Sequence, residues 1–211
     1  IAPHAPYSVS DEAFTLINTY SEELNINIHT HLHETQWEIE ASIDKYGITP
    51  VQRLNNLGII GPSLTAAHCV YLNDQDMGIL AKNKVSIVHN PSSNMKLGSG
   101  IADVAKMLKQ NLSVSLGTDS SASNNRLDIM EEMRLAALLI KGSTKSPESI
   151  PANEAIKMAT INGAKALGLG SVIGSIEKNK KADLVAIDLS AIENQPIYNP
   201  ISTLVYSSSR S

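Results

Sequence analysis

Five short polar segments are spaced along this chain, each at or just after the end of an apolar stretch. They are His4 and the segments 31–35, 65–68, 89–91 and 117–119, which contain histidine, glutamate and aspartate side chains. In a barrel of alternating strands and helices, side chains at the carboxyl ends of the strands converge on one site. Imidazoles and carboxylates gathered there can bind a divalent metal and transfer protons. The spacing therefore predicts part of a metal-dependent hydrolase.

The second segment belongs to a run with histidine at alternate positions, His29, His31 and His33. Side chains alternate between the two faces of a strand, so the run predicts three imidazoles on one face. Imidazole nitrogens are good ligands for zinc and similar metals, and Glu34 adds a carboxylate at the same strand end. Taken alone, a histidine pair on a strand fits a hydrogen-bonded structural role equally well, and Glu34 fits a solvated charge at a helix start.

His68 and Asp119 end two later apolar stretches. His68 follows three small residues, as expected where a strand end brings its side chain close to a crowded centre. By itself, a buried histidine is more often structural, and an aspartate at this place more often caps the next segment. Histidine, glutamate, histidine and aspartate at the ends of successive strands are hard to obtain from independent structural needs. Their coincidence favours a shared site.

The composition limits what such a site acts on. The chain has 211 residues, 42% of them hydrophobic, and a net charge of −4 with acidic and basic residues interspersed. This balance argues against an electrostatic surface for nucleic acid or membrane, so we expect a small-molecule substrate. The single cysteine, Cys69, has no partner for an internal disulfide, and no apolar run reaches the ~20 residues that cross a bilayer. With no signal peptide evident, we expect a cytoplasmic protein.

The elements that would position these residues alternate along the chain. Strand-like runs cover 26–32, 63–69, 85–89 and 112–116. Helical patterns cover 10–24, the residues after Thr35, those after Asn73, 101–110 and 127–141. Thr35 and Glu38 fit a capping box at the start of the second helix. Four strand-to-helix units predict an α/β fold with a parallel sheet.

The pattern changes after Gly142. Pro151 fits the start of a helix that continues over 152–167. A charged turn followed by the apolar run 184–187 then predicts a short β hairpin. We therefore expect a partial barrel over 1–170 and a segment of a flanking β domain over 171–211. Because the chain starts without methionine at what reads as the end of a strand, we expect it to be a segment of a longer protein.

Four motifs carry a resemblance to a known family. They are His-Leu-His-Glu-Thr at 31–35, Ala-His-Cys at 67–69, His-Asn-Pro-Ser-Ser-Asn-Met-Lys-Leu-Gly at 89–98 and Gly-Thr-Asp-Ser-Ser-Ala-Ser-Asn-Asn at 117–125. Together they resemble the amidohydrolase superfamily and, within it, the 5-methylthioadenosine/S-adenosylhomocysteine deaminase branch. The segment 182–185 is typical of the small β domain of that family. The resemblance covers essentially the whole chain and implies a TIM-type (β/α)8 barrel, of which this chain holds about strands 4 to 8.

The resemblance also implies roles for individual residues. His31 and Asp119 correspond to metal ligands, and His68 lies beside the metal. Glu34 and Asp119 correspond to residues that contact the substrate as well as catalyse, and His4 corresponds to a histidine that contacts the nucleoside end. At His33 the family pattern leads us to expect a different residue, so its role is open. We expect His89 to shape the following loop.

The implied reaction is hydrolytic deamination of an adenosine analogue to the inosine analogue and ammonia. One divalent metal, zinc before iron or manganese, would make water nucleophilic at neutral pH. Asp119 would accept a proton, His68 would stabilise the addition, and Glu34 would deliver a proton to the ring nitrogen next to the attacked carbon.

One part of the family pattern is absent from this sequence. The first-strand His-x-His, which supplies two further ligands, has no counterpart on the appropriate strand, so we expect weak metal binding and no turnover from these residues alone. Two alternatives stay open. The protein acts on another amino- or chloro-substituted heterocycle, such as guanine, cytosine or a triazine. Or it is a non-catalytic half-barrel whose open strand edges pair with another polypeptide or a second copy. We expect a homo-oligomer or association with the missing amino-terminal part.

Overall fold

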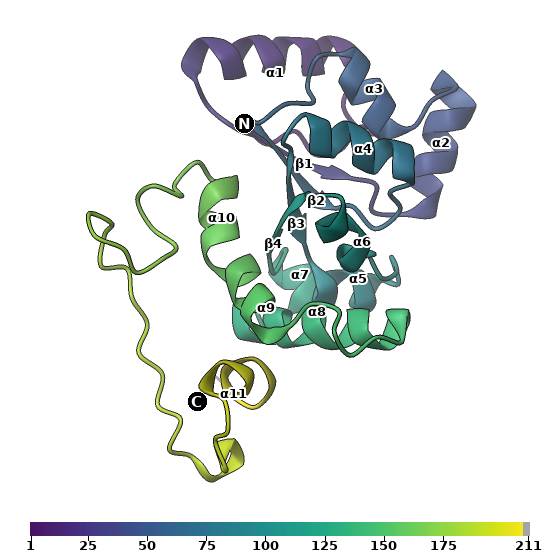
Figure 1. Ribbon diagram of the computed structural model, residues 1–211. Helices are drawn as coiled ribbons and strands as arrows, with labels where there is room; N and C mark the ends of the chain where they lie inside the picture. The colour runs from purple at the N-terminus through teal and green to yellow at the C-terminus, as the bar shows by residue number, and fades with distance from the viewer. Residues whose placement is uncertain (209–211) are drawn as a thin grey trace.

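The computed structural model describes residues 1–208, and within them a four-stranded parallel sheet forms the centre of an α/β fold (Figure 1). Strands β1 (Ile28–Leu32), β2 (Leu64–His68), β3 (Ser86–His89) and β4 (Ser113–Leu116) lie side by side in chain order. Leu32 pairs with His68, and His89 pairs with Leu116. The carboxyl ends of neighbouring strands therefore lie level at one edge of the sheet. The predicted α/β fold with a parallel sheet is confirmed.

Helices follow each strand and cover the sheet. The helices are α1 (Asp11–Leu24), α2 (Gln36–Tyr46), α3 (Pro50–Asn56), α4 (Asp74–Lys82), α5 (Pro91–Leu97), α6 (Val104–Lys109), α7 (Ser121–Asn124), α8 (Ile129–Thr144), α9 (Ala152–Ala159), α10 (Ile161–Ala166), the 3₁₀ helix η1 (Ile192–Asn194) and α11 (Pro200–Tyr206). Strand residues such as Ile28, Leu64 and Ile87 are fully buried in one apolar core with side chains from these helices. No helix among residues 1–208 is both long and apolar enough to span a membrane.

Local sequence signals explain most helix starts, with two corrections. Thr35 caps α2 by accepting the N–H of Glu38, as predicted. The Glu38 carboxylate, however, accepts the N–H of Glu34 instead of that of Thr35, because the side chain turns inward and is buried. The predicted helix over 152–167 is interrupted at Thr160, whose φ of −129° and ψ of −97° separate α9 from α10.

The predicted β hairpin is wrong for the described chain. Residues 171–191 contain no strand, and several of their apolar side chains are exposed, including Ile176 by 88% and Val185 by 86%. A lone two-stranded hairpin is marginal in water unless it packs against more strands. In Figure 1 this segment runs away from the sheet before α11 packs against α8 and α9.

Both edges of the sheet are partly covered by other residues of the chain. Along β1, the N–H groups of His29 and His31 donate to the carbonyls of Ile1 and His4, at 2.9 Å and 3.1 Å. Next to β4, Asn162 of α10 donates from its side chain to the Val114 carbonyl at 2.9 Å. The first contact has a consequence for the site, because it lays the backbone of His4 against His31.

Arg53 of α3 anchors the segment that follows His4. Its buried guanidinium donates to the Pro6 carbonyl at 2.5 Å and to the Asp11 carboxylate at 2.7 Å, and it stacks over the Tyr46 ring at 4.2 Å. A planar guanidinium can make these contacts together, whereas an ammonium group cannot. Arg53 therefore fixes the path of residues 5–11 along α3.

We expect Arg53→Lys to lower the free energy of unfolding by about 2 kcal/mol, because the carbonyl and carboxylate it serves lose a shared donor. Denaturant unfolding monitored by circular dichroism measures the change. Arg126→Lys, at a side chain that is 64% exposed, is the matched control and should change stability little. Equal effects of the two substitutions would contradict the anchoring role.

Candidate active site

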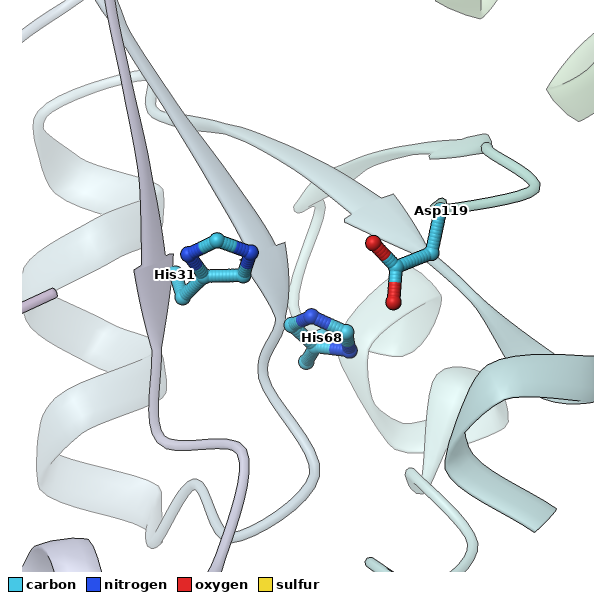
Figure 2. A group of neighbouring side chains, drawn as sticks. All are labelled: His31, His68 and Asp119. Carbon is cyan, nitrogen blue, oxygen red and sulfur yellow. The ribbon is translucent and has the colours of Figure 1, made fainter. Parts of the chain in front are cut away.

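Three side chains meet where the strands end (Figure 2). His31 lies on β1, His68 ends β2, and Asp119 follows β4. One potential ligand atom from each lies within 4.8 Å of the others. The two imidazole rings stack with their centroids 5.3 Å apart and an interplanar angle of 19°. Level strand ends thus bring residues from widely separated parts of the chain to one point.

The backbone fixes the orientation of His31. Its Nδ1 lies 2.6 Å from the carbonyl oxygen of His4, so Nδ1 must carry the proton and donate it. The neutral ring then presents an unprotonated Nε2, which is the form that binds a metal. The His4 ring packs edge-on against His31, with centroids 5.1 Å apart, and its own Nδ1 is 2.7 Å from the Ser8 hydroxyl.

His68 is held in the same manner by Asn94 of α5. The His68 Nδ1 donates to the Asn94 Oδ1 at 2.8 Å, and both side chains are buried. Its Nε2 lies 3.9 Å from Oε2 of Glu34, whose other oxygen accepts the Ser99 hydroxyl at 3.1 Å. His68 has a positive φ of +71°, which turns its side chain off the end of the strand. The Glu34 carboxylate and the His68 imidazole therefore lie side by side at the end of the sheet.

Asp119 presents an anionic carboxylate to the two imidazoles. Its Oδ2 accepts the hydroxyls of Ser93 and Ser123, both at 2.6 Å, which leaves Oδ1 available. Burial raises the pKa of Asp119, but hydrogen bonds from the Ser123 and Ser93 hydroxyls and the Ser120 backbone, together with the nearby His68 ring, hold the pKa below its usual range. Like His68, Asp119 has a positive φ, here +61°.

The group opens into a cavity of about 440 Å³. Its wall includes His4, His29, His31, His68, Asn90 and Asp119. This volume lies in the range of pockets for small organic ligands. His29 and His31 share this face, as the alternation along the strand predicts.

The donor set fits a divalent cation. Two imidazole nitrogens with fixed tautomers and one carboxylate oxygen are ligands typical of zinc in hydrolytic sites. The family resemblance predicts that His31 and Asp119 bind the metal and that His68 lies beside it, and the structure brings all three within reach of one ion.

Two histidines lie elsewhere. The prediction that His33 shares the face of His31 is wrong, because β1 ends at Leu32 and a φ of +54° turns His33 into a buried space between loops. His89 is also buried, and desolvation lowers its pKa to about 4. The cavity wall is formed by its neighbours Val88 and Asn90.

Sequence reasoning missed the polar residues that hold the central group. Ser93, Asn94 and Ser99 lie in and just after the polar run 89–98, and Ser123 lies in the run 117–125. Both runs carried the family resemblance, but no role was assigned to these positions. Their partners lie 26 or more residues away, apart from the local Ser123 contact, so no local pattern pairs them.

Glu38 lies in the first turn of α2, four residues after Glu34. It is 1% exposed, and its Oε2 accepts the Glu34 N–H at 2.9 Å, while Oε1 has no partner among the described residues. Burial raises the pKa of Glu38 to about 7, against backbone hydrogen bonds from Glu34 and His33 that lower it. The carboxyl group therefore titrates near neutral pH next to the site.

Comparisons with known proteins agree with this arrangement. The model of the amidohydrolase family matches residues 1–210. The 5-methylthioadenosine/S-adenosylhomocysteine deaminase of Acetivibrio thermocellus is 47% identical over 211 residues, which are 100% of this chain and 49% of that protein. The chain thus spans about half the length of the curated relatives it matches.

Two solved structures extend the comparison. An adenosine deaminase from Xanthomonas campestris with bound zinc is 41% identical, with a TM-score of 0.97 over 99% of this chain and 48% of that one. An atrazine chlorohydrolase from Arthrobacter aurescens, complexed with zinc, is 26% identical, with a TM-score of 0.92 over 99% of this chain and 46% of that one.

Replacing Glu38 with glutamine should remove a pH-dependent loss of stability. Between the ordinary carboxyl pKa of 4.5 and about 7, the folded chain retains a proton that the unfolded chain releases. The free energy of unfolding therefore falls as pH rises through this window. We expect Glu38→Gln to gain up to about 3 kcal/mol relative to the parent between about pH 5 and pH 8, measured by urea unfolding. Glu40→Gln, on the exposed face of α2, should follow the parent, and a Glu38→Gln difference that does not vary with pH would refute the assignment.

Proposed function

The chain belongs to the amidohydrolase family, and we propose that it supplies the carboxyl-terminal half of a metal-dependent deaminase site for an adenosine analogue, 5-methylthioadenosine or S-adenosylhomocysteine. The observation that carries this proposal is the convergence of His31, His68 and Asp119 within 4.8 Å, with Glu34 against His68. The name of the Acetivibrio thermocellus relative supports the substrate class.

Each residue has a proposed task that its surroundings support. A divalent metal, zinc as in the Xanthomonas campestris structure, would supply a Lewis acid that activates water. His31 and Asp119 would hold it. Asp119, kept anionic by its two serine partners, would also accept the proton of the attacking water.

Glu34 and His68 would act on the base of the substrate. Glu34 would deliver a proton to the ring nitrogen beside the attacked carbon, which makes that carbon electrophilic. His68 would stabilise the oxygen that adds to this carbon, and its bond to Asn94 keeps Nε2 directed to the site. As the adduct collapses, the proton that Asp119 accepted would pass to the amino group, which leaves as ammonia. The hydroxyl proton would return to Glu34, which leaves the inosine analogue. His4, on the cavity wall, would contact the nucleoside end.

The rest of the barrel is part of the same proposal. This chain would provide about strands 4 to 8 over residues 1–170, and 171–211 would belong to a flanking β domain. Exposed apolar side chains in the segment 171–191, such as Val185, support the proposal that this segment pairs with strands outside this chain. We propose that the preceding half completes the barrel, within one polypeptide or as an associated chain, or that the chain forms a homo-oligomer. A cytoplasmic location is consistent with the reduced, buried Cys69.

A second candidate is hydrolysis of another substituted heterocycle. The similarity to atrazine chlorohydrolase over nearly the whole chain favours it, because the same metal and carboxylates can displace chloride or ammonia. A panel of 5-methylthioadenosine, S-adenosylhomocysteine, guanine, cytosine and atrazine separates the candidates by kcat/KM. Faster turnover of atrazine or guanine than of the nucleosides would favour the second candidate.

In the full-length protein, we expect Glu34→Gln, His68→Asn and Asp119→Asn each to lower kcat for nucleoside deamination by about a hundredfold or more. Glu34→Gln and Asp119→Asn each remove a proton-transfer group, and His68→Asn removes the group that stabilises the adduct. Ammonia release measures kcat, and zinc content is measured in parallel. Asp119→Asn should also lower zinc content, whereas Glu34→Gln should not. Glu40→Gln, a charge loss elsewhere on α2, is the control, and full activity of Glu34→Gln would contradict the proposed proton transfer.

The 211-residue chain alone should bind zinc weakly and show no turnover, because the first-strand histidines of the family pattern are absent from it. Adding the amino-terminal half of the Acetivibrio thermocellus relative, as a fusion, should restore both properties. Equilibrium dialysis and the ammonia assay measure them. A zinc-loaded, active chain without that half would overturn the proposal that the site is incomplete.

A further inference from the structure

His33 is a fully buried residue in a backbone conformation that histidine seldom adopts. It directly follows β1, with a φ of +54° and 0% exposure. A non-glycine residue in the left-handed region persists only where its surroundings hold it there. The turn separates His31, whose side chain faces the cavity, from Glu34, which approaches His68.

Two hydrogen bonds join His33 to Tyr71, in the loop that follows His68. The Tyr71 N–H donates to the His33 carbonyl at 3.1 Å, and the His33 Nδ1–H donates to the Tyr71 carbonyl at 3.1 Å. The backbone and the side chain of His33 thus bind the backbone N–H and the backbone carbonyl of Tyr71. These two hydrogen bonds connect the loop after β1 to the loop after β2, one residue from Glu34.

The second ring nitrogen holds the start of α3. The Val51 N–H donates to the His33 Nε2 at 3.2 Å. N–H groups in the first turn of a helix have no partner within the helix, so this bond satisfies a donor that would otherwise be buried alone. The ring must therefore be neutral, with its proton on Nδ1, to serve Tyr71 and Val51 at once.

We propose that His33 is a positioning residue, which sets the separation of Glu34 from His68 by tying the loop that carries Glu34 to the loop that directly follows His68. The proposal rests on the proposed deaminase function, in which Glu34 and His68 act on the same substrate. Their side chains lie 3.9 Å apart, and Ser99 and Asn94 hold their far sides. Those bonds orient each side chain, whereas the hydrogen bonds of His33 to Tyr71 join the loop that carries Glu34 to the loop that follows His68.

The test compares three variants in the full-length protein with zinc bound. His33→Asn keeps a donor near the position of Nδ1 and tolerates a positive φ, whereas His33→Gln keeps an acceptor nearer to Val51 and His33→Ala keeps neither. We expect kcat of His33→Asn to stay within about threefold of the parent. His33→Gln and His33→Ala should lower kcat about tenfold or more while KM changes less than about threefold, since displaced proton-handling groups slow the chemical step.

Ser42→Ala is the matched control. It removes a buried bond to the Ile48 carbonyl, 2.8 Å long, in the same region but without contact to the loops at the site. It should lower Tm and leave kcat unchanged. His33→Gln and His33→Ala with lowered Tm but parental kcat would show a structural role alone and overturn the proposal. A kcat of His33→Asn as low as that of His33→Ala would overturn it as well.

Hydrogen exchange separates this proposal from the deaminase proposal. The amides of Val51 and Tyr71 should exchange faster in His33→Ala than in the parent or in Ser42→Ala. If the parent protein deaminates no heterocycle, the deaminase proposal fails. In that case, unchanged exchange at the Val51 and Tyr71 amides in His33→Ala would separately show that His33 does not hold the two loops together. Faster exchange together with parental kcat in His33→Ala would reject the positioning role.

Discussion

The parallel register of β1 to β4 is the constraint on which the site depends. Neighbouring strands end level, so residues at or just beyond the strand ends meet although long stretches of chain separate them. A shift of one residue in β2 would break the pairing of His68 with Leu32 and carry His68 away from His31. The apolar core under the sheet, with Ile28, Leu64 and Ile87 fully buried, opposes such a shift. Burial of apolar side chains in the core therefore holds the strand register, and with it the polar side chains at the carboxyl ends of the strands.

Hydrogen bonds then decide which face of each polar group is left for a ligand. Nδ1 of His31 donates to the His4 carbonyl, and Nδ1 of His68 donates to Asn94. Two serine hydroxyls donate to one oxygen of Asp119. What remains is a pair of imidazole nitrogens and a carboxylate oxygen, which together suit a divalent cation. Residues at the strand ends with positive φ, His68 and Asp119 among them, add the turns that direct these groups inward.

The sequence predicted those strands and helices whose apolar residues recur at regular spacing along the chain. Alternating and continuous apolar runs located β1 to β4, and the polar residues after them, His31, His68 and Asp119, are the ones that the structure brings together. His33 was misplaced because a left-handed turn directly after Leu32 breaks the alternation and leaves no mark in a run of alternate histidines. The contacts of Asn94 and Ser99 span 26 and 65 residues, so only the folded chain pairs them with His68 and Glu34. The segment 171–191 has strand-like residues but no described strand to pair with, so local propensity alone was misleading there.

We propose that His31, His68 and Asp119 gather around one divalent metal. Diffraction from crystals of the full-length protein, collected on both sides of the zinc absorption edge, tests this proposal. We expect a single anomalous peak bonded to His31 and Asp119, with His68 beside it. An anomalous peak away from these three side chains, in a protein whose activity depends on zinc, would contradict the proposal.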